Sequence, residues 1–296
     1  MKSKFNTEFI YQLLNKENIE AGLYVIATPL GNLSDITIRS LNILSTSSIV
    51  YCEDTRVSKK LTSKFGINCK FKPFHKYNFK KVLPEIIYKL QNGEIISLIS
   101  DAGTPLISDP GFELVRECRE NNIEVYSLPG PSAVIASLVA SGLPTNNFTF
   151  LGFFPRTNKE IKKFLKKTSE SLETIIFFES PKRLLKTIKL ISNELNNRKI
   201  AIVKKLTKKN EEIIYGDCSM VIDKLNNHKK IKGEVTIVVS PSNEKTIKTI
   251  TDKELLSLIK KRIKYNYSIQ DLSNELSKQL GIPRRRIYQM ALKLKN

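Results

Sequence analysis

The sequence contains few of the residues that build metal sites and disulfide frameworks. Among its 296 residues are four cysteines, at positions 52, 69, 118 and 218, and two histidines, His75 and His228. No two cysteines are spaced as a C-x-x-C pair, which is the spacing that zinc sites and redox motifs use. We therefore expect no bound metal and no disulfide framework, which fits a reducing compartment.

Long apolar runs and glycine-rich phosphate loops are also missing. A membrane-spanning helix needs a run of about 18 apolar residues, and no such run occurs. Residues 1–22 lack the apolar core and cleavage site of a secretory signal. The patterns G-x-G-x-x-G and G-x-x-x-x-G-K-S/T are absent, so NAD and ATP are not indicated. We expect a cytoplasmic, soluble protein that does not bind membranes.

Positive charge dominates the composition. The chain has 49 Lys+Arg against 29 Asp+Glu, a formal net charge of +20. A folded protein this basic usually binds polyanions such as nucleic acid. An AT-rich genome would also enrich Lys, Asn and Ile, and it explains the total charge equally well. Clusters of charge are therefore better evidence for a partner than the total.

The pattern of apolar runs predicts a first α/β domain over residues 22–144, after a polar extension at 1–21. Short, partly β-branched runs bounded by Gly, Pro or Asp predict buried strands at 23–28, 48–53, 95–100 and 124–129. Helical patterns lie at 35–44, 82–92, 111–121 and 131–142, with Asp35 as the expected N-cap of the first. Such alternation favours a mostly parallel sheet with helices on both faces.

A second α/β domain is expected over residues 147–244, and a basic helical unit over 250–296. The predicted strands of the second domain are 174–180, 199–207, 211–217 and 234–240, with helices at 159–170 and 182–195. Short loops join its last three strands, so we expect antiparallel pairing and a mixed sheet. In the helical unit, two helices separated at Gly281–Pro283 are typical of a small helix-turn-helix.

Four polar turns rich in Gly or Pro follow the predicted strands of the first domain. They are Thr28–Leu33, Glu53–Arg56, Ser100–Gly111 and Pro129–Ala133. In open α/β sheets ligands bind beyond the carboxyl ends of the strands, and glycine lets the backbone approach a ligand closely. An ordinary Asp-Gly turn would explain any one of them, but four at one sheet edge predict a ligand site.

These turns resemble those of a known family. YVIATPLGNLSDIT (24–37), YCEDTR (51–56), SDAGTPLISDPG (100–111) and LPGPSA (128–133), in this order, are similar to motifs of the tetrapyrrole methylases, the class III S-adenosylmethionine methyltransferases. Within that superfamily they most resemble bacterial ribose-2′-O-methyltransferases of small-subunit rRNA. The likeness continues through LGFFPR (151–156), FFESPKR (177–183) and GEVTIVV (233–239).

The resemblance implies two α/β domains with S-adenosylmethionine between them, a homodimer, and no metal. It implies methylation of the 2′-hydroxyl of a cytidine in the decoding region of 16S rRNA, within the small ribosomal subunit. The positions that match the donor-binding motifs are Pro29, Asp101, Gly103, Thr104, Ser132, Ala133 and Phe178. One departure is Lys205, which stands where the family usually has a glutamate and argues against an essential carboxylate there.

The turn after the second predicted strand holds the candidate catalytic residues. Glu53 and Asp54 are candidate general bases, and Arg56 can hold a backbone phosphate through two parallel hydrogen bonds. Asp54 can equally be the N-cap of the next helix. If it is catalytic, Asp54→Ala abolishes methylation and spares donor binding.

The candidate RNA-binding residues are Arg156, Lys182, Arg183, Arg284, Arg285 and Arg286. The three consecutive arginines are the strongest of these, because an AT-rich genome enriches Lys and not Arg. Two other functions remain open: methylation of a tetrapyrrole or other small molecule, and an inactive RNA-binding assembly factor. Binding of the methyl donor separates the inactive factor from both enzymes.

Overall fold

The computed structural model describes residues 18–195, 198–227, 233–242, 252–263, 268–280 and 283–294. The chain divides into two compact units, one ending at Ser240 and the other formed by residues 169–172 and 241 onward. The first unit contains both sheets. Most of the predicted extension at 1–21, together with His228, lies outside the described residues.

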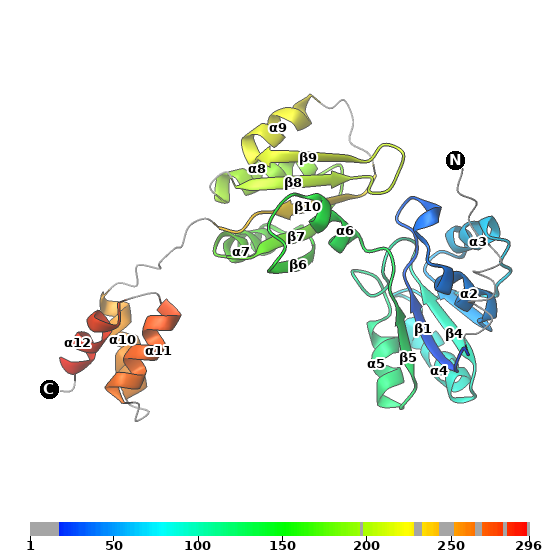
Figure 1. Cartoon of the computed structure of the whole chain (residues 1–296), viewed down its shortest axis with the longest axis horizontal. Coiled ribbons are helices and arrows are strands. Elements are labelled where there is room, and N and C mark those ends of the chain that lie inside the picture. Colours follow the sequence, from blue (N-terminus) through cyan, green and yellow to red (C-terminus); the bar gives the residue numbers. More distant parts are fainter. Residues whose placement is uncertain are drawn as a thin grey trace, which may run out of the picture. The chain divides into compact units, whose positions relative to one another are not determined.

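The first sheet is entirely parallel, which confirms the prediction. Its order is β3 (Phe71–Pro73), β2 (Ile49–Cys52), β4 (Ile95–Ile99), β1 (Gly22–Ile26) and β5 (Val125–Leu128). Figure 1 labels β4, β1 and β5 of this sheet. The sequence did not predict β3, which is three residues long and half-exposed. Because all five strands are parallel, their carboxyl ends and the turns that follow them share one edge of the sheet.

Helices cover both faces of this sheet, as expected. Along β1, Leu23 and Val25 join one apolar cluster, whereas Tyr24 and Ile26 join another, because successive strand residues point to opposite faces. The first cluster is completed by α4 (Phe79–Gln91) and α5 (Phe112–Glu120), and the second by α2 (Ile38–Thr46) and α3 (Thr55–Lys64).

The predicted N-cap at Asp35 is wrong. Residues Leu33–Asp35 form a 3₁₀ turn, and α2 begins only at Ile38. Its N-cap is Thr37, whose extended backbone lets Oγ1 accept the N–H of Ser40 at 3.1 Å. The Thr37 hydroxyl is two residues nearer along the chain to the free N–H groups of α2 than the Asp35 carboxylate is.

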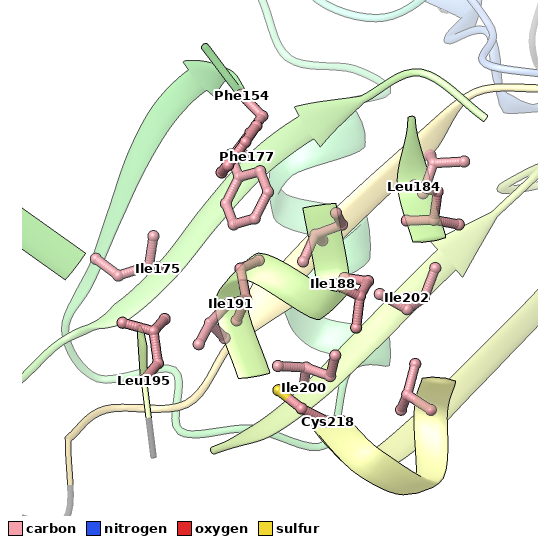
Figure 2. Close-up of a cluster of buried hydrophobic side chains, with 14 of the residues drawn as sticks. Phe154, Ile175, Phe177, Leu184, Ile188, Ile191, Leu195, Ile200, Ile202 and Cys218 are labelled. Atoms are coloured by element: carbon pink, nitrogen blue, oxygen red, sulfur yellow. The ribbon is translucent and has the colours of Figure 1, made fainter. Parts of the chain in front are cut away.

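The second sheet is mixed, as predicted. Its order is β6 (Phe148–Phe153), β7 (Thr174–Glu179), β10 (Val235–Val239), β8 (Lys199–Lys204) and β9 (Glu212–Asp217). β6 and β7 are parallel, and the other neighbouring pairs are antiparallel. Figure 2 shows the apolar core on one face, formed with α7 (Asn158–Ser169), α8 (Leu184–Glu194) and α9 (Cys218–Asn226). β6 and α9 were not predicted.

The second compact unit is a small helical bundle. It contains α10 (Asp252–Ile263), α11 (Ile269–Leu280) and α12 (Arg284–Leu292), which pack around Leu255, Leu272 and Ile287. The break between α11 and α12 falls where the sequence predicted it. No helix in the described ranges has the length and hydropathy that crossing a membrane requires. All four cysteines are free thiols.

Candidate active site

A cavity of about 370 Å³ lies in the first unit, beside the loops that follow β4 and β5. Six of the predicted donor-binding residues line it: Asp101, Gly103, Thr104, Ser132, Ala133 and Phe178. The predicted Pro29 is buried, and its neighbour Leu30 lines the cavity. The structure thus gathers segments that are far apart in the sequence around one cavity.

Three of the four predicted turns, those after β1, β4 and β5, are joined at this cavity by hydrogen bonds of 2.9 Å. Thr28 and Gly103 exchange two backbone hydrogen bonds of 2.9 Å, and Oγ1 of Thr28 donates to the carbonyl of Ser100 at 2.9 Å. The hydroxyl of Ser100 donates to the carbonyl of Gly103 at 2.9 Å. Oγ1 of Thr104 donates to the carbonyl of Pro131, also at 2.9 Å. These bonds fix the cavity wall before any ligand arrives.

Glycine is required at two points of this wall. Gly103 has φ +83°, and a Cβ there would lie 3.1 Å from Cδ2 of Leu30. A Cβ at Gly130 would lie 2.9 Å from Cβ of Ala27. Larger residues would push the turns apart, so the close packing of the loops explains both glycines.

The amino-terminal end of α6 (Ala133–Ala140) faces the cavity. Ser132 is its N-cap, and Ser132 and Ala133 both line the cavity wall. The free N–H groups and dipole at such an end favour a carboxylate or phosphate. The cavity therefore offers one anion-binding end as well as carboxylates that suit a cation.

The acidic side of the cavity contains Asp101 and Asp109. Burial raises the pKa of Asp101. Burial, followed by the charges of Glu53 and Asp101, raises the pKa of Asp109 to about 6. Asp109 lies just before the helix predicted at 111–121, and α5 indeed begins at Phe112 with Gly111 as its N-cap. An Asp-Pro-Gly sequence reads as an ordinary turn, so no local signal identified Asp109.

The three candidate catalytic residues do not line the cavity but connect to it. Asp54 caps α3, since its Oδ1 accepts the N–H of Arg56 at 2.8 Å. The Arg56 guanidinium pairs with the same carboxylate at 2.6 Å and lowers the pKa of Asp54 to about 2. The backbone N–H of Asp54 donates to Oδ1 of Asp101 at 3.1 Å. The capping interpretation is confirmed, and the catalytic roles of Glu53, Asp54 and Arg56 stay predictions.

Residues at the end of β7, among them Phe178 and Glu179, supply another part of the cavity wall. The ring of Phe178 packs edge-on against Phe153, with centroids 5.4 Å apart. Arg183, predicted to contact RNA, donates to the carbonyls of Phe154 and Pro155 and pairs with buried Glu179 at 2.6 Å. Its guanidinium is thus bound to this wall and supports it.

Lys205, at the departure from the family pattern, lies behind the cavity wall. Its φ is 52°, and a Cβ on Gly233 would lie 2.9 Å from its Cγ. Gly233 lines the cavity, whereas Lys205 is not among the lining residues. Nearby, Oγ1 of Thr207 accepts the N–H of Asn32 at 3.1 Å. The loop from β8 therefore packs against the turn that follows β1.

The remaining basic candidates are on the surface. Arg156 and Lys182 are exposed in the first unit. Arg284, Arg285 and Arg286 are exposed in the first turn of α12, and Arg286 pairs with Asp252 at 2.6 Å. Cations at a helix amino terminus oppose its dipole. Local helix stability therefore does not explain this placement.

Comparison with known proteins agrees with the geometry. The family model described as Tetrapyrrole (Corrin/Porphyrin) Methylases matches residues 22–220. A Mesorhizobium japonicum protein named Ribosomal RNA small subunit methyltransferase I is 39% identical over 94% of each chain. A protein of the same name from Hydrogenobaculum sp. is 45% identical over 75% of this chain and 96% of its own. The solved structure of a diphthine synthase has a similar fold, with TM-score 0.59 and 12% identity, over 74% of this chain and 89% of its own.

Proposed function

The chain belongs to the tetrapyrrole methylase family, and from this we propose that it methylates the ribose 2′-hydroxyl of a cytidine in the decoding region of 16S rRNA. S-adenosylmethionine is the methyl donor. The acceptor class follows from the relatives, which are named Ribosomal RNA small subunit methyltransferase I. The position of the modified nucleotide and the 2′-oxygen follow from the motif resemblance alone.

The cavity is the observation that carries the proposal. Asp101 suits the hydroxyls or the amine of the donor, and the amino-terminal end of α6 at Ser132 suits its carboxylate. Phe178 supplies an apolar surface. The donor's sulfonium is cationic, and the carboxylates of Asp101 and Asp109 favour a cation in the same cavity. Residues of the cavity thus suit the hydroxyls or amine, the carboxylate and the sulfonium of the donor.

The basic surface supports RNA as the acceptor. Arg284 and Arg285 are exposed and stand where a helix disfavours positive charge. Arg156 and Lys182 are exposed after β6 and β7. Phosphate contacts of this kind make binding strongly salt-dependent. Binding of the small ribosomal subunit that did not weaken with salt would contradict this part of the proposal.

We also propose that the protein is a homodimer and that it acts in the cytoplasm. Exposed apolar side chains, including Ile135 and Val139 on α6 and Phe153 on β6, provide surface that a second copy can cover. The structure describes one chain, so the measurement is molar mass in solution. A monomer at micromolar concentration would contradict it.

Two alternatives are separated by simple experiments. An inactive assembly factor would bind neither S-adenosylmethionine nor its demethylated product, whereas this cavity predicts binding of both by calorimetry. A small-molecule methylase would transfer labelled methyl groups to a tetrapyrrole. We expect the label in 16S rRNA of 30S subunits and none in a porphyrinogen offered in parallel.

A further inference from the structure

The loop Ser100–Gly111 is bent so that both of its ends reach the cavity. Leu106 and Ser108 have backbone φ angles of 71° and 70°. Residues other than glycine rarely adopt this left-handed conformation. Gly111 has φ +135°, and a Cβ there would lie 2.8 Å from Leu106 Cδ1. Strained backbone of this kind persists where the surrounding structure holds it, often at functional sites. In the bent loop, Asp101 and Asp109 line the same cavity.

The surroundings of Asp109 differ from those of the other cavity carboxylates. Glu179 pairs with Arg183 at 2.6 Å, and Glu234 pairs with Lys208 at 2.7 Å. Both of those carboxylates are neutralised by cations. The charged groups that act on Asp109 are instead two further carboxylates, Glu53 and Asp101.

This environment makes Asp109 a better proton acceptor than Asp54. Arg56 holds the pKa of Asp54 at about 2, so that carboxylate is a weak base. Burial and the two neighbouring carboxylates raise the pKa of Asp109 to about 6. General-base catalysis is most efficient when the pKa of the base lies near the working pH. Asp109 meets this condition and also lines the cavity.

We propose that Asp109 is the general base of the methyl transfer, an inference that rests on the function proposed above. Its carboxylate accepts the proton of the acceptor hydroxyl while the hydroxyl oxygen forms a bond to the methyl carbon. The carbon–sulfur bond breaks, and its electron pair stays on sulfur, which becomes a neutral thioether. The proton on Asp109 then passes to solvent. Atoms and charges balance without a further reactant.

The proposal also concerns donor binding, because the donor carries a sulfonium charge and its product does not. Ionised Asp109 attracts that charge. Donor affinity should therefore increase as pH rises through about 6, while product affinity changes less. This difference between donor affinity and product affinity can be measured without RNA and without methyl transfer.

The test compares Asp109→Asn with Glu120→Gln, which removes a carboxylate from an exposed ion pair on α5. Single-turnover methylation of 30S subunits should fall by about 10²–10⁴-fold in Asp109→Asn, the usual contribution of a general base. The control should retain the wild-type rate. Product binding by calorimetry should be retained in both variants, because asparagine preserves the shape of the side chain.

The outcomes separate the base role from the proposed function. If the wild type methylates 30S subunits and Asp109→Asn stays within about tenfold of it, the base role is wrong. Loss of product binding in Asp109→Asn would also overturn the role, since the residue would then bind ligand. An unchanged pH dependence of donor affinity in Asp109→Asn contradicts it independently. A wild type that binds donor but does not methylate rRNA counts against the proposed function itself.

Discussion

The backbone N–H of Asp54 donates a hydrogen bond to Oδ1 of Asp101 at 3.1 Å. This bond joins the turn after β2 to the donor loop after β4. The N–H group belongs to the backbone, so the hydrogen bond remains possible when the Asp54 side chain is replaced by that of alanine. The side chain instead caps α3 and holds Arg56. Donor positioning and acceptor positioning can therefore be separated by mutation.

Asp54→Ala is expected to abolish methylation and to spare donor binding. The substitution removes the cap of α3 and releases Arg56, which we propose holds a phosphate of the acceptor. The backbone bond to Asp101 remains. Single-turnover methylation and calorimetry with the donor product measure the two effects. Near-normal turnover would remove Asp54 from the mechanism.

Gly103→Ala is expected to weaken donor binding by about tenfold or more, equivalent to about 1.4 kcal/mol. An added Cβ would be only 3.1 Å from Leu30 at the cavity wall. Gly93→Ala is a matched control, because Gly93 has a similar φ of +79° with nothing within 4 Å of the added atom. Both variants carry the same backbone strain. Equal donor affinity in the two would show that the wall at Gly103 does not contact the donor.

The difference in stability between Asp109→Asn and the wild type should depend on pH. The pKa of Asp109 is raised from 3.8 to about 6 in the folded protein, so ionising it costs folding free energy. The contribution of Asp109 to wild-type stability is full below the unfolded pKa and is lost as pH rises to about 6. The asparagine variant does not titrate, so its melting temperature should exceed the wild type's above that pH. The difference should vanish near pH 4, and a pH-independent difference would contradict the raised pKa.

Replacing Arg284 and Arg285 by alanine should weaken binding to 30S subunits and reduce its salt dependence. Each lost phosphate contact lowers the slope of log affinity against log salt by about 1. The bundle itself should not be destabilised, because these cations oppose the dipole of α12. Lys293→Ala, at the other end of α12, controls for the loss of charge. An unchanged salt slope in the double variant would exclude the arginines from RNA contact.

Much of the fold could be predicted because the strands are apolar runs separated by helical patterns. The short strand β3 could not, since Phe71–Pro73 is half-exposed and includes a lysine. The strand β6 was not predicted either: none of its residues is fully buried, and its register with β7 shifts between Phe150 and Phe153. The position of the cap at Thr37 depended on a 3₁₀ turn that the residue types do not specify.

Part of the candidate site could also be predicted from the sequence. Donor residues such as Asp101 and Gly103 belong to recognisable motifs, and their cavity follows from the shared sheet edge. Asp109 was not among the predicted site residues, because its approach to the cavity depends on left-handed backbone at Leu106 and Ser108. That backbone is held by packing against residues distant in sequence, such as Leu98 beside Gly111. Local sequence does not contain this information.

Incubation of labelled S-adenosylmethionine with 30S subunits that lack the modification tests the central claim most directly. The RNA is digested to nucleosides, and the labelled nucleoside and its position in 16S rRNA are identified by mass spectrometry. We expect one product, 2′-O-methylcytidine, in the decoding region. Label on a base, on another RNA or on a ribosomal protein would contradict the proposed function.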